Sequence, residues 1–130
     1  MSEDNLGLAN FTALSTGKVG LPTDAQRELL AILSEESGET IQVVGKILRH
    51  GYNAYNPLLK DELVMMNRSL LHKEAGHIVS ALALLVASGD LSLSLMRKSA
   101  ILKLDNIDQW LRFQASSTIN DAKLLIDAVV

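Results

Sequence analysis

Residues 22–51 read PTDAQRELLAILSEESGETIQVVGKILRHG and decide the fold, because they predict one long α-helix. Thr23 is the expected N-cap, and Gln26, three residues later, completes a capping box. Apolar residues then recur at helical spacing until two basic residues and Gly51, which are typical of a helix C-terminus. The sequence therefore predicts a helix over residues 23–50.

The composition suits packed helices. The chain has 130 residues, 48% of them hydrophobic but only 4% aromatic, so its core must be aliphatic. Leu, Ala, Ile and Val dominate, and a chain of this length fits one domain. We expect an all-α helical bundle of about four helices, with an N-terminal arm over residues 1–21 and a single domain over residues 22–130.

A second long helix is expected to follow a loop that begins at Gly51. Asn56 suits an N-cap and Pro57 suits the first helical position. The helical period continues to about Ser88, with a break near Asn67 as an alternative.

The remaining chain predicts two shorter helices. One begins after a cap at Asp90 or Ser92 and runs to about Phe113. The other runs from Ile119 to Ala128, with Thr118 as its cap.

Residues 78–87 are apolar on nearly every face. A monomer of this size has too few neighbouring helices to cover such a segment, so we expect a homodimer or homotetramer. The same run is too short to span a bilayer. An acidic N-terminus without a following apolar segment gives no sign of a signal peptide. We expect a cytoplasmic protein that does not bind membranes.

Charge and cysteine content exclude several classes of function. The formal net charge of −3 argues against binding to a nucleic acid polymer. The absence of cysteine excludes disulfides and thiolate metal sites. The glycine spacings form neither a Walker loop nor a dinucleotide-binding loop.

Three glutamates in the middle of the first helix are the sharpest candidate site. Glu35 and Glu39 lie one turn apart, and so do Glu36 and Glu39. Like charges at this spacing destabilise a helix unless a cation compensates them. The cluster therefore suggests a hard divalent cation, although most short glutamate clusters are solvated faces.

The second helix carries a polar stripe that can face this cluster. Glu74 and His77 stand three residues apart, and Asn67 precedes Glu74 by seven. A lone histidine is usually bonded to a carbonyl, but the neighbouring Glu74 favours a ligand or a group that orients one. Lys46, seven residues after Glu39, and Arg49 add cations that suit phosphate binding.

These residues resemble the motifs of the MazG-like all-α nucleoside triphosphate pyrophosphohydrolases. That family, whose relatives include dimeric dUTPases and phosphoribosyl-ATP pyrophosphohydrolase, carries EExxE on one helix and ExxD on the next. Glu35, Glu36 and Glu39 complete the first motif. The second resembles residues 73–77, followed by a similar apolar run. The likeness covers about residues 25–110.

The resemblance implies a role for each matching residue. Glu36, Glu39 and Glu74 match the family's metal ligands, and Glu35 stands close behind them. The family's last aspartate falls at His77, which is a departure, because imidazole suits Mn²⁺ or Zn²⁺ better than Mg²⁺. A further likeness concerns Lys103 and Asn106, which are similar to a Lys and Asn pair near the family's substrate.

The function implied is metal-dependent hydrolysis of an NTP or dNTP to the monophosphate and pyrophosphate, with Mg²⁺ as cofactor and Mn²⁺ as the alternative. Glu35 and Glu39 are the expected catalytic residues. The expected metal ligands are Glu36, Glu39, Glu74 and His77, and the expected substrate-binding residues are Lys46, Arg49, Asn67, Lys103 and Asn106. Two alternatives stay open. One is a catalytically weakened oligomer that binds nucleotides or a protein, and the other is a dimetal carboxylate bundle built on the Glu74-x-x-His77 spacing.

Overall fold

The computed structural model describes residues 20–60 and 64–129, so most of the predicted N-terminal arm lies outside the described residues. Every regular element within these ranges is helical, and they contain no strand. The predicted all-α class is therefore confirmed. The elements are α2 (Asp24–His50), α3 (Asn67–Ala87), α4 (Leu93–Ile107), the 3-10 helix η2 (Asp108–Trp110) and α5 (Thr118–Val129).

The ends of α2 lie where the sequence predicts them. The Thr23 hydroxyl accepts the Gln26 amide hydrogen at 3.2 Å, and the Gln26 side chain accepts the Thr23 amide at 2.9 Å. This is the predicted capping box, which satisfies two of the free amides at the helix start. At the other end Gly51 has φ 94°, a conformation that favours glycine, and its amide donates to Ile47 O at 2.8 Å.

The start of α3 differs from the prediction. Asn56 accepts the Leu58 amide through its side chain at 3.0 Å, but this closes a turn rather than a helix. Residues 57–60 and 64–66 are not helical, and α3 begins at Asn67. The alternative prediction placed a break in the helix near this residue. Two carbonyl groups of the preceding loop explain this start. Ala54 O accepts a hydrogen bond from the Asn67 amide at 2.9 Å, and Tyr52 O accepts one from the Arg68 amide at 2.8 Å. These acceptors satisfy two amides that the first turn leaves free.

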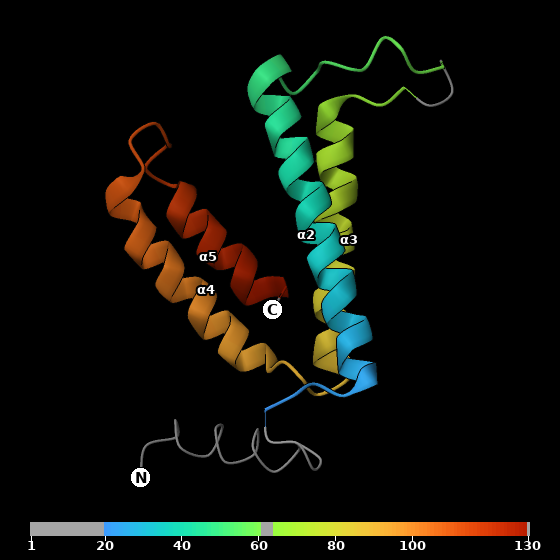
Figure 1. The fold of residues 1–130 in the computed structure, drawn as a ribbon. Helices are drawn as coiled ribbons and strands as arrows, with labels where there is room; N and C mark the ends of the chain where they lie inside the picture. Colours follow the sequence, from blue (N-terminus) through green and yellow to red (C-terminus); the bar gives the residue numbers. More distant parts are fainter. Residues whose placement is uncertain (1–19, 61–63, 130) are drawn as a thin grey trace. The chain divides into compact units, whose positions relative to one another are not determined.

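α2 and α3 lie side by side as an antiparallel hairpin (Figure 1). The side-chain amide of Asn67 donates to Gly51 O at 3.0 Å. Together with the two backbone bonds to Tyr52 and Ala54, this bond forms what we call the hairpin base. Asn67, Glu74 and Ala81 are buried and follow one another at seven-residue intervals, so a single stripe of α3 faces inward.

The chain divides into two compact units, one ending at Leu82 and the other beginning at Ala83. The first contains the hairpin up to Leu82, and α3 itself continues through the boundary without interruption. The single domain expected over residues 22–130 stays a prediction.

The second unit contains α4 and α5, which run side by side and are linked by an ion pair between Lys123 and Asp105 (Figure 1). Ser92 caps α4 as predicted, accepting the Leu95 amide at 3.4 Å. The prediction that this helix reaches Phe113 is wrong. The α-helix ends at Ile107 and tightens into η2, and Phe113 is 96% exposed, so no packing supports a longer helix.

The last helix agrees with its prediction to within one residue at each end. Thr118 is its first helical residue rather than its cap, and its amide donates to Ala115 O at 3.0 Å.

Few apolar side chains are buried within the chain. Among the described residues they are Val43, Ala81 and Leu85. Many others are exposed, including Ile41, Val44 and Leu48 on α2. α3 as a whole is long and apolar enough to cross a membrane, by length and composition alone. Its first half, however, carries the buried carboxylate of Glu74, and a stretch without charged residues begins only at residue 78.

Candidate metal centre

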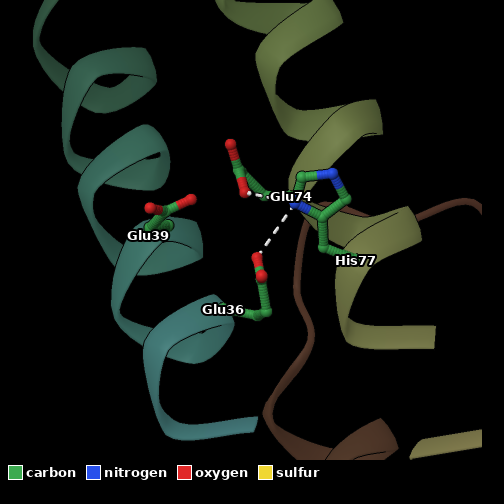
Figure 2. Close-up of side chains that lie close together, drawn as sticks. All are labelled: Glu36, Glu39, Glu74 and His77. Atoms are coloured by element: carbon green, nitrogen blue, oxygen red, sulfur yellow. Dashed lines mark hydrogen bonds and ion pairs between the residues drawn. The ribbon is translucent and has the colours of Figure 1, made fainter. Parts of the chain in front are cut away.

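Four side chains from the two helices of the hairpin converge midway along it. Glu36 and Glu39 project from α2, and Glu74 and His77 project from α3 (Figure 2). One ligand atom from each, three carboxylate oxygens and an imidazole nitrogen, lies within 4.8 Å of the others. The structure thus brings together the same four residues that the sequence suggested as metal ligands.

Helical spacing explains why each helix contributes a pair. Residues three apart lie on one face about a turn from each other, so Glu36 with Glu39, and Glu74 with His77, each form a local pair. The antiparallel arrangement then sets the two pairs opposite each other. Local sequence fixes each pair, and the hairpin joins them.

His77 provides the direct contact between the two helices at this centre. Its Nδ1 lies 2.9 Å from Oε2 of Glu36 and 3.3 Å from Oε2 of Glu74. The ring is 42% exposed, whereas the side chain of Glu36 is 18% exposed. The imidazole therefore lies at the rim of the centre, with one nitrogen turned toward the carboxylates (Figure 2).

Glu74 is the buried member of the cluster, with a side chain 5% exposed. Its Oε1 lies 3.4 Å from Nζ of Lys73, but its Oε2 accepts no hydrogen bond from any described residue. A buried carboxylate oxygen without a donor is costly, because burial removes its bonds to water. This oxygen points into the cluster, where a cation would satisfy it.

The carboxyl groups of Glu39 and Glu74 influence each other's protonation. Glu74 raises the pKa of Glu39, because its carboxylate accepts a hydrogen bond from protonated Glu39 and repels the charged form; burial and Glu36 act in the same direction. Burial opposes the charge of Glu74, but hydrogen bonds from Glu39 and Lys73 and the charge of Lys73 outweigh it and lower the pKa of Glu74.

These donors fit a divalent cation. Three carboxylates suit hard cations such as Mg²⁺ and Mn²⁺, and an imidazole suits first-row transition metals. The inner oxygen of Glu74, which accepts no hydrogen bond from the described residues, and the raised pKa of Glu39 both indicate a place where negative charge is crowded. The fit rests on four groups from two helices rather than on one run of acidic residues.

Three predicted residues of α2 lie outside the cluster. Glu35, one residue before Glu36, is exposed, and so are Lys46 and Arg49, which lie farther along the helix. Their predicted roles in catalysis and substrate binding stay predictions.

The other predicted substrate contacts are also apart from the four ligands. Asn67 belongs to the hairpin base, where the residue is 5% exposed and its side-chain amide donates to Gly51 O. Lys103 and Asn106 are exposed on α4, in the second unit. The roles of these three residues stay predictions as well.

Sequence reasoning missed two contacts around the centre. Lys73 pairs with Glu74, its neighbour in the sequence, although adjacent residues on a helix do not face each other. The guanidinium of Arg68 lies 4.4 Å from the centre of the Tyr52 ring, a cation–π contact beside the hairpin base. Only the loop geometry reveals the second contact, because 16 residues separate its members.

Comparison of the chain with protein-family models, with curated proteins and with solved structures finds no match in any of the three.

Proposed function

We propose that the chain is a metal-dependent nucleotide pyrophosphohydrolase that cleaves an NTP or dNTP to the monophosphate and pyrophosphate. The observation that carries this proposal is the convergence of Glu36, Glu39, Glu74 and His77 within 4.8 Å. The resemblance of the two short motifs to the MazG-like family supplies the reaction class. Phosphoryl and nucleotidyl transfer depends mainly on charge neutralisation and positioning, which such a cluster suits.

A divalent cation bound by these four residues would neutralise phosphate charge and increase the acidity of a coordinated water. The chain's own groups would do the rest. Glu35 is exposed beside Glu36 and would accept the proton of the attacking water. Lys46 follows Glu39 by seven residues, so it projects from nearly the same face of α2 and would bind the phosphates together with Arg49.

The same proposal includes a homo-oligomer, dimer or tetramer, in the cytoplasm. It is supported by the small apolar interior of the described residues, in which Val43, Ala81 and Leu85 are the buried apolar side chains. Exposed apolar side chains on α2, α4 and α5 offer the area that association requires.

The deciding experiment measures pyrophosphate release from a panel of NTPs and dNTPs, with Mg²⁺ and then with Mn²⁺. Glu39→Gln should abolish release, because it removes a charged ligand and keeps the shape of the side chain. Glu28→Gln is the matched control, since Glu28 is an exposed glutamate of α2 outside the cluster. Release that persists unchanged in Glu39→Gln would exclude this site.

The same preparation separates the alternatives. Nucleotide binding without turnover would indicate a catalytically weakened member that acts as a binding protein. Iron in the purified protein would indicate a dimetal carboxylate centre, which needs a second Glu-x-x-His pair from another copy in addition to Glu74 and His77.

A further inference from the structure

We propose that His77 makes this centre selective for first-row transition-metal cations, with Mn²⁺ as the probe, over Mg²⁺. The inference rests on the metal-binding part of the proposed function and is independent of the substrate. It follows from the position of one imidazole nitrogen among three carboxylates.

The first step is that His77 offers a ligand atom rather than only a neighbouring charge. Its Nδ1 lies 2.9 Å from Glu36 Oε2 and 3.3 Å from Glu74 Oε2, so the nitrogen belongs to the same small volume as the carboxylate oxygens. Figure 2 shows the other ring nitrogen turned away from them. Because a carboxylate accepts and cannot donate, Nδ1 donates the hydrogen in its contact with Glu36, and a bound cation would take the place of that hydrogen.

The second step is that the centre needs a cation independently of His77. Glu74 is 5% exposed and its Oε2 receives no hydrogen bond from the residues that the structure describes. Lys73 is the cation paired with Glu74, and it approaches the other oxygen while remaining half-exposed. Lys73 does not reach the inner oxygen, and His77 Nδ1 lies 3.3 Å from it without forming a hydrogen bond, so an ion between the two helices would complete the cluster.

The third step is the chemistry of the donor set. Mg²⁺ binds oxygen almost exclusively and gains little from an imidazole. Mn²⁺ also favours oxygen but accepts nitrogen more readily than Mg²⁺ does, and the later transition metals bind imidazole well. Three carboxylates alone would serve both kinds of cation. The imidazole adds a donor that mainly the transition metals use, and selectivity follows from this difference.

The test measures dissociation constants of Mn²⁺ and Mg²⁺ by calorimetry, without nucleotide, in the wild type and in His77→Asp. The ratio of the two constants is the readout, because an added carboxylate strengthens binding of any divalent cation. We expect His77→Asp to reduce the preference for Mn²⁺ by about tenfold or more, since even outer partners of metal ligands change affinity by ~10–100-fold. His72→Asp, on an exposed position of α3, is the matched control and should leave the ratio unchanged.

A direct spectroscopic readout complements the ratio. Diamagnetic Zn²⁺ should shift the ¹⁵N resonance of Nδ1 in His77 and leave those of His50 and His72 in place. His77→Ala, which adds no charge, should also lower the Mn²⁺ preference and serves if His77→Asp fails to fold.

The outcomes distinguish this inference from the proposed enzyme. An equal Mn²⁺ to Mg²⁺ ratio in the wild type and both His77 variants would overturn the selectivity and leave a cation site in place. Absence of binding by either cation would overturn the site itself. Selective binding without pyrophosphate release would uphold the role of His77 and reject the proposed reaction.

Discussion

Glu36 Oε2 and His77 Nδ1 lie 2.9 Å apart although 41 residues separate them in the chain. This contact aligns the turn of α2 that carries Glu36 with the turn of α3 that carries His77. The two remaining carboxylates lie beside this pair, Glu39 on α2 and Glu74 on α3 (Figure 2).

A divalent cation should stabilise the folded protein. It would satisfy the inner oxygen of Glu74 and offset repulsion among three carboxylates. With Mn²⁺ at about 100 times its Kd, binding to the folded state alone raises the free energy of unfolding by ~2.7 kcal/mol. Thermal melting with Mn²⁺ and with EDTA measures the shift. Glu39→Gln should lose most of it and Glu28→Gln none. An equal response in both variants would contradict a site at Glu39.

Cation binding should weaken as the pH falls. The raised pKa of Glu39 means that a proton occupies the cluster at a pH where a free glutamate would be charged, and the cation must displace it. Calorimetric titration of Mn²⁺ at about pH 5 and about pH 7 should show weaker binding at the lower pH, with proton release in buffers of different ionisation enthalpy. Binding that is equal at both pH values would contradict the raised pKa of Glu39.

Without a cation, the raised pKa of Glu39 and the lowered pKa of Glu74 change the stability of the protein with pH in opposite directions. The raised pKa of Glu39 contributes stability that is fully present below the unfolded value of 4.5 and is lost as the pH rises through its folded value. The lowered pKa of Glu74 contributes stability that is present above 4.5 and is lost as the pH falls through its folded value. Stabilisation by Mn²⁺ should therefore be larger near neutral pH, where repulsion at Glu39 is complete.

Asn67→Ala should destabilise the hairpin. The change removes the 3.0 Å bond to Gly51 O at a position 5% exposed, and loss of such a bond typically costs about 1–3 kcal/mol. Chemical denaturation measures the loss, and Asn53→Ala, at an exposed position in the same loop, is the control. A variant as stable as the wild type would exclude the structural role of Asn67. If Asn67 also binds substrate, the folded variant will show a raised KM for nucleotide.

Ile41→Glu should reduce the oligomer mass. Ile41, Val44 and Leu48 form a stripe along one face of α2 and are 72%, 41% and 81% exposed. Such a stripe is typical of a surface that packs against another chain. Size-exclusion chromatography with light scattering measures the mass, and Gln42→Glu on an exposed neighbouring position is the control. A wild-type protein that is monomeric at all concentrations would reject the proposed oligomer.

The features that depend on local sequence could be predicted. The capping box at Thr23 and the glycine after His50 define both ends of α2, because each end is specified within a few residues. The pairs on each helix follow from the three-residue spacing. The four candidate ligands could be proposed as a set for this reason, with the family resemblance as a second indication.

The features that depend on contacts between residues distant in sequence could not be predicted. Pro57 is a good helix start by composition, yet α3 begins at Asn67, where carbonyls from the preceding loop receive its first amides. Phe113 continues the apolar pattern of α4, yet the helix ends at Ile107. The buried structural bond of Asn67 was likewise invisible in the sequence, which indicated only a polar residue in line with Glu74.

The hairpin base sets the direction in which the ligands of α3 point, because it fixes the rotation of the helix at Asn67. It lies at the first turn of α3, and each residue of an α-helix turns the chain by about 100°. Removing one residue between Asn67 and Glu74 would therefore swing Glu74 and His77 away from α2, even though every ligand remained in the sequence. Removing one residue from 57–60 would leave the hairpin base and the directions of the ligand side chains as they are. A one-residue deletion should accordingly be tolerated within residues 57–60 and should disrupt the centre within residues 68–73.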